Sequence, residues 1–100
     1  MLIENKDFEI IKNILISNIP EYEVRAFGSR VHGNNIKPFS DVDLAIVTET
    51  PLDDSKYITL KQDFENSNLP VKVDIVDWAI IDEDFRKVIS ENFEIIQKAK

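Results

Sequence analysis

The sequence predicts an α/β fold of the α+β type: a small mixed β-sheet with helices mainly on one face. Apolar residues recur at helical spacing near the start of the chain, and three short segments alternate with a period of two. Helical and strand-like segments also follow one another along the sequence. Only a short helix fits between the first two strands, so these strands are expected to be antiparallel, because a parallel pair needs a longer crossover.

Length and composition predict one domain, residues 1–100, with one modest core. The net charge of −7 argues against direct binding to nucleic acid, which depends on Lys and Arg contacts to phosphate. The absence of Cys excludes disulfides and a Cys-based metal site. The beginning of the chain has no long apolar run, so we expect a cytoplasmic protein that does not enter a membrane.

The first helix is predicted over residues 6–17, where Phe8, Ile11 and Leu15 recur at helical spacing. Pro20 follows and ends it. The alternating sequence of residues 21–27 then predicts the first strand.

A strand-to-helix turn is predicted at Gly28 and Ser29, because Gly permits close backbone approach and Ser can cap the short helix that follows. After a polar loop, residues 41–47 predict the second strand. The period of two places Asp41 and Asp43 on one face of that strand and the aliphatic residues on the other.

The second half of the chain predicts a third helix, a third strand and a fourth helix. Asp53 or Asp54 is a plausible N-cap for the third helix, and Asp82 for the fourth. The third strand is predicted over residues 71–78. Residues 92–97 either add a short edge strand or simply pack.

The candidate catalytic and metal-binding residues are three acids, Asp41, Asp43 and Asp74, on one face of adjacent predicted strands. A bare Asp-x-Asp is most often a solvated pair, but Asp is depleted from strands and an unpaired acid in an apolar strand is costly. Three such carboxylates repel one another unless a divalent cation joins them. Oxygen ligands favour Mg²⁺ or Mn²⁺ over zinc.

The candidate phosphate-binding residues are Gly28, Ser29 and Arg30. Their backbone N–H groups lie at a helix start beside the strand that carries the acids. The Ser29 hydroxyl can donate to a phosphate oxygen, and we expect Arg30 to offer its planar guanidinium to the same group.

Other side chains receive structural interpretations. Asp77 competes with Asp74 for the role of third carboxylate, but the period of two places it on the opposite face. Lys72 lies on the same face as Asp74. A structural role as the salt-bridge partner of Asp74 explains it as well as a role in the site does. The aromatic residues Trp78, Phe85 and Phe93 fit the core or a partner interface.

The segments GSRVHG, SDVDLAIV and VDIVDW together resemble the minimal nucleotidyltransferases of the DNA polymerase β superfamily. The resemblance implies the nucleotidyltransferase fold, with Gly28 and Ser29 at the nucleotide phosphates and Asp41, Asp43 and Asp74 at two metal ions, Mg²⁺ or Mn²⁺. It also implies transfer of AMP from ATP with release of pyrophosphate.

The short members of this family resemble antitoxins of bacterial toxin–antitoxin pairs. This implies a hetero-oligomer with a HEPN-domain ribonuclease toxin that is adenylylated on a tyrosine. Three alternatives stay open at this point: a transferase for a small hydroxylated molecule, an antitoxin that only masks its partner's surface, and a nucleotide sensor that transfers nothing.

Overall fold

The computed structural model describes residues 1–33, 36–37 and 40–100, and along them helices and strands alternate. Within those ranges no helix is both long and apolar enough to cross a membrane. In chain order the elements are α1 (Asn5–Asn18), β1 (Glu23–Phe27), α2 (Ser29–His32), β2 (Val42–Val47), α3 (Asp54–Glu65), β3 (Val73–Asp77), α4 (Glu83–Glu91) and β4 (Glu94–Gln97).

The strands form one sheet in the order β3-β2-β1-β4. β1 is antiparallel to both β2 and β4, whereas β2 and β3 are parallel. This confirms the predicted mixed sheet and its antiparallel first pair. Residues 92–97 were expected either to add an edge strand or only to pack, and they contain the edge strand β4.

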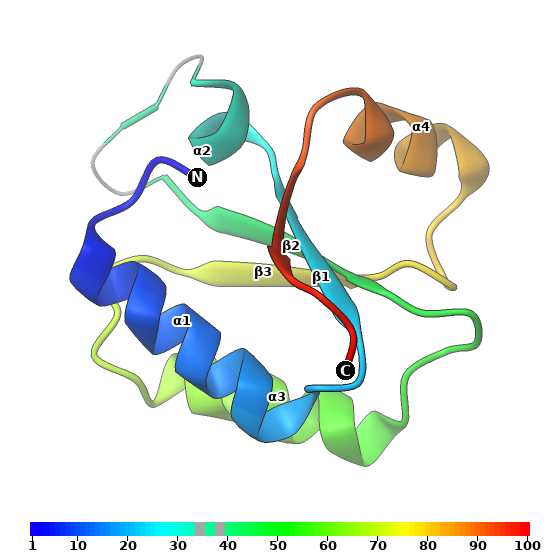
Figure 1. Ribbon diagram of the computed structural model, residues 1–100, viewed down its shortest axis with the longest axis horizontal. Coiled ribbons are helices and arrows are strands. Elements are labelled where there is room, and N and C mark those ends of the chain that lie inside the picture. The colour runs from blue at the N-terminus through cyan, green and yellow to red at the C-terminus, as the bar shows by residue number, and fades with distance from the viewer. Residues whose placement is uncertain (34–35, 38–39) are drawn as a thin grey trace.

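The sheet separates two layers of helices (Figure 1). The long helices α1 and α3 lie side by side on one face, while the short helix α2 and α4 lie on the other side. The core fills the space between the sheet and the two longest helices, α1 and α3. Its fully buried side chains include Ile11, Leu15, Val24, Ala26, Val42, Leu44, Ile46 and Leu60.

The predicted helix caps are present. The carboxylate of Asp53 accepts a hydrogen bond from the Ser55 N–H at 3.1 Å, and that of Asp82 accepts one from the Phe85 N–H at 2.8 Å. Such caps satisfy N–H groups that a helix start leaves without an intrahelical partner. They fix where α3 and α4 begin.

Candidate active site

The strand register brings the predicted acids to one face of the sheet. Asp43 on β2 is in register with Asp74 on β3 and with Phe27 on β1. Residues in register share a face, so these side chains point away from the core, which receives the fully buried Leu44. Asp41 is exposed just before β2 and has the same parity. The acids therefore share the face opposite α1 and α3.

The three acids interact electrostatically. Burial first, then the charges of Asp74 and Asp41, raise the pKa of Asp43 to about 6. On the neighbouring strand, Lys72 Nζ lies 3.2 Å from Asp74 Oδ1. This contact first, then the charges of Asp74 and Asp41, raise the pKa of Lys72. The lysine therefore offsets part of the negative charge of the acidic group.

A divalent cation fits this site by charge and by donor type, since oxygen ligands suit Mg²⁺ and Mn²⁺. Asp43 also feels the negative charges of Asp74 and Asp41, which a cation between them would offset. In the described part of the chain, however, no three His, Asp or Glu side chains are already gathered closely enough to hold a metal. A metal ion bound at Asp74 would have to replace the ammonium contact of Lys72.

The turn at Gly28 packs directly against Asp43. Gly28 has φ 82° and ψ −160°, a conformation that is essentially restricted to glycine. A Cβ at this position would overlap Asp43 Oδ2 and lie 3.2 Å from Asp43 Cγ. Only a glycine therefore lets the backbone of the turn approach the carboxylate this closely.

The same turn starts α2. The Gly28 carbonyl accepts hydrogen bonds from the N–H groups of Val31 and His32 at 3.0 and 3.1 Å. The helix has four residues and ends at Gly33, which is left-handed with φ 81°. Ser29, its first residue, is partly exposed. The beginning of α2 thus lies next to the acid face.

Arg30 differs from our expectation. Its side chain is buried, and instead of pointing to an open phosphate site it donates to main-chain carbonyls: Nε to Ser40 at 2.8 Å and Nη1 to Leu2 at 2.9 Å. The Leu2 N–H in turn donates to the Arg30 carbonyl at 2.6 Å. These contacts make Arg30 a residue that fixes the turn to its surroundings.

Asp77 has a structural environment, as the period of two predicted. It is buried and in register with the core residue Ile46. Its carboxylate accepts hydrogen bonds from the Thr48 hydroxyl and from the N–H groups of Leu52 and Ala79 at 2.7 and 3.3 Å. It therefore joins the segments that follow β2 and β3 and does not face the other acids.

The aromatic residues that we assigned to the core or to an interface are half-buried between the sheet and α4. The Arg25 guanidinium lies over the rings of Trp78 and Phe93, at 5.2 and 4.6 Å from their centroids. Arg86 of α4 donates from Nε to the Trp78 carbonyl at 2.9 Å. The Arg86 bond thus joins α4 to the segment after β3, and the cation–π contacts join Trp78 and Phe93 to β1.

Phe27 is a site neighbour that the sequence analysis did not single out. It precedes Gly28 and is in register with Asp43, and its ring packs edge-on against Phe85 of α4 with centroids 5.8 Å apart. The cross-strand register is the signal that could have identified it, but the sequence alone did not give that register. Phe27 forms an apolar wall beside the acids.

A Gly-Ser turn packed against an acid-bearing strand of a mixed sheet agrees with the resemblance to nucleotidyltransferases. Residues 9–100 match the family described as polymerase beta, nucleotidyltransferase, and the chain belongs to that family.

Particular relatives are similar over nearly the whole chain. A Haemophilus influenzae protein named "Probable protein adenylyltransferase MntA" is 46% identical over 96 residues, which are 96% of this chain and 83% of that protein. A structure described as a toxin-antitoxin with AMP-PNP has a TM-score of 0.72 at 24% identity, covering 93% of this chain and 74% of the other.

A second structure contains the tri-AMPylated Shewanella oneidensis HEPN toxin with its MNT antitoxin. It has a TM-score of 0.69 at 21% identity, covering 97% of this chain and 74% of the other. At these identities the two solved structures establish the shared fold.

Proposed function

We propose that this chain is an antitoxin that transfers AMP from ATP to a tyrosine of a partner HEPN-domain toxin. The observation that carries the proposal is the contact between Gly28 and Asp43, which joins the Gly-Ser turn to the acid face. The 46% identity to a protein named as a protein adenylyltransferase supports the reaction. The toxin–antitoxin assemblies among the structural neighbours support the partner and a hetero-oligomer. We also propose the cytoplasm as its location.

In this proposal the nucleotide phosphates lie at the turn. The N–H groups of Gly28 and Ser29 and the Ser29 hydroxyl donate to phosphate oxygens. Arg30 positions the turn through its bonds to the carbonyls of Leu2 and Ser40.

The acids Asp41, Asp43 and Asp74 would hold divalent cations, two Mg²⁺ ions or alternatively Mn²⁺. When bound, these ions would neutralise phosphate charge and lower the pKa of the attacking hydroxyl. Asp74, on the edge strand β3, would hold the cation that lowers the pKa of that hydroxyl or would accept its proton. The tyrosine oxygen bonds to the α-phosphorus, the bond to pyrophosphate breaks, and AMP stays on the tyrosine.

The test is to incubate the purified chain with its co-encoded partner, ATP and Mg²⁺ and to measure the intact mass of the partner. We expect additions of one or more AMP groups, located on tyrosine by peptide mapping, and pyrophosphate in equal amount. The Asp41→Asn and Asp43→Asn variants should bind the partner but transfer nothing.

Other outcomes distinguish the alternatives. If those variants neutralise the toxin as well as the parent does, the chain acts by masking its partner. If AMP is transferred only to free hydroxylated small molecules, a small-molecule transferase is the correct function. If nucleotide binds without release of pyrophosphate, the chain is a sensor.

A further inference from the structure

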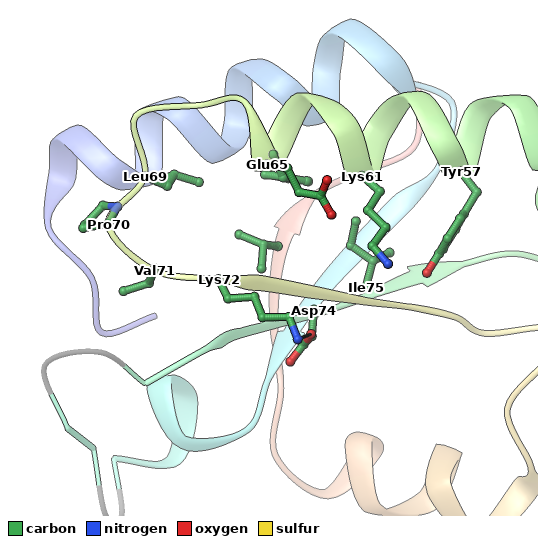
Figure 2. Close-up of a pocket in the computed structure, with 11 residues that line it drawn as sticks. Tyr57, Lys61, Glu65, Leu69, Pro70, Val71, Lys72, Asp74 and Ile75 are labelled. Atoms are coloured by element: carbon green, nitrogen blue, oxygen red, sulfur yellow. Dashed lines mark ion pairs between the residues drawn. The ribbon is translucent and has the colours of Figure 1, made fainter.

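A groove follows the outer edge of β3, between that strand and α3 (Figure 2). Two cavities of about 390 and 380 Å³ adjoin there and share Tyr57 and Ile75 as lining residues. The first extends toward Leu69 and the second toward Ile81. The groove therefore extends along the whole length of β3.

The main chain at this edge has free hydrogen-bonding capacity. Main-chain groups of Lys72 and Trp78 bond to β2, with N···O distances of 2.9 and 3.0 Å. Successive residues of a strand direct these groups to opposite sides, so those of Val73 and Ile75 point outward. β3 is the first strand in the sheet order, and in the described part of the chain no strand pairs with its outer side. Such an edge is a template for another strand.

The two faces of an added strand would meet different surroundings. Side chains on one face would enter the groove beside Val73 and Ile75, which are only half-buried although they belong to the core face. Side chains on the other face would lie next to Asp74, because Asp74 points to the acid face. Neighbouring side chains of paired strands are about 4.5–5.5 Å apart. A hydroxyl on the added strand would thus reach the site.

Lys61 gives the groove a cation that an acidic residue of the occupant can contact. Lys61 of α3 and Lys72 of β3 both line it in a chain of net charge −7, and Figure 2 shows the Lys61 side chain extending from the helix toward the strand. The Lys72 side chain is 70% exposed, so it can contact a second carboxylate besides Asp74. Glu65 and Asp74 line the same cavity and balance the two lysines. Lys72 already pairs with Asp74, however, whereas Lys61 makes no ion pair with the described residues.

We propose that an extended segment of the acceptor protein adds to β3 as a further strand and so presents its hydroxyl side chain to Asp74. Its apolar residues fill the groove, and a carboxylate on it contacts Lys61. This inference rests on the proposed function and assigns the surface by which the acceptor reaches the site. It makes the edge of β3 the substrate-positioning surface, as in other cases of β-strand addition.

The direct test is amide hydrogen exchange by NMR on the full chain, alone and in complex with the acceptor protein, with AMP transfer measured in parallel. We expect the amides of Val73 and Ile75 to exchange at least tenfold more slowly in the complex. Those of Asp74 and Val76, which face β2, should change little. Unchanged exchange at Val73 and Ile75 alongside normal transfer would overturn strand addition and leave the proposed function intact.

Two other results are also decisive. Absence of AMP transfer to the acceptor protein would refute the proposed function and the inference with it. Protection of Val73 and Ile75 in the free chain that disappears on dilution would mean that a second copy occupies the edge, which would overturn the assignment to the acceptor.

Variants test the same surface by kinetics. Ile75→Pro removes an outward N–H, which edge strands tolerate, whereas Ile75→Ala keeps that donor and serves as the matched control. We expect Ile75→Pro to lower transfer at least tenfold below Ile75→Ala, with ATP binding retained by both. Lys61→Glu should weaken acceptor binding severalfold, while Lys98→Glu, outside the groove, should not. A folded Ile75→Pro variant with the transfer rate of Ile75→Ala would contradict the proposal.

Discussion

Replacing Gly28 by Ala tests whether the turn and the acid face act as one unit. The backbone conformation at Gly28 costs a non-glycine residue about 1–3 kcal/mol, which lowers the free energy of unfolding. The new methyl group also overlaps the Asp43 carboxylate, which must move away. Since a misplacement of about 1 Å in a site can cost about 10²-fold in rate, we expect AMP transfer to fall by at least that factor.

Gly33→Ala is the matched control. Gly33 also has a positive φ, but the nearest atom to an added Cβ is Leu2 Cδ1 at an ordinary 3.6 Å. This variant should lose about 1–2 kcal/mol of stability from its left-handed backbone and keep its transfer rate. Urea unfolding gives the stability of both variants, and pyrophosphate release under conditions where both are folded gives the rate. Equal rates for the two variants would refute the reasoning.

Three further predictions concern charged side chains. The folded-state pKa of Asp43 is raised to about 6, so ionisation of this carboxyl destabilises the fold as pH rises through that value. Asp43→Asn should therefore raise Tm at pH above 7 in metal-free buffer, and the difference in Tm should vanish toward pH 4. An equal or lower Tm of the variant at high pH would contradict this. Asp77→Ala leaves buried donors such as the Thr48 hydroxyl without their acceptor and should cost about 2–4 kcal/mol in chemical unfolding, yet leave transfer per folded molecule unchanged. Lys72→Gln frees Asp74 from an exposed ion pair and should lower the Mg²⁺ concentration for half-maximal activity by a few-fold at most, because exposed ion pairs are weak. A higher Mg²⁺ requirement would argue against metal at Asp74.

Strand periodicity was sufficient to predict which acids share a face. The alternation in β2 placed Asp43 opposite the aliphatic residues, and the same parity in β3 separated Asp74 from Asp77. The structure confirms both placements, because side-chain direction in a strand depends only on local backbone geometry. The roles of these acids as metal ligands stay a prediction.

Contacts between distant segments could not be predicted in this way. Nothing local to Arg30 indicates that its guanidinium binds the carbonyls of Leu2 and Ser40, since α2 is too short for its polar and apolar faces to be distinguished. The packing of Gly28 on Asp43 also depends on the β1–β2 register, which the sequence left open.

The contact between Gly28 and Asp43 restricts the length of the acidic side chain as well as its charge. A glutamate at position 43 would keep the charge but would carry one more methylene into the space that the missing Cβ of Gly28 leaves. Substitutions at these two positions are therefore not independent. An engineer who wants to move the metal site or to change the carboxylate would have to redesign the turn and the strand together, treating positions 28 and 43 as one element.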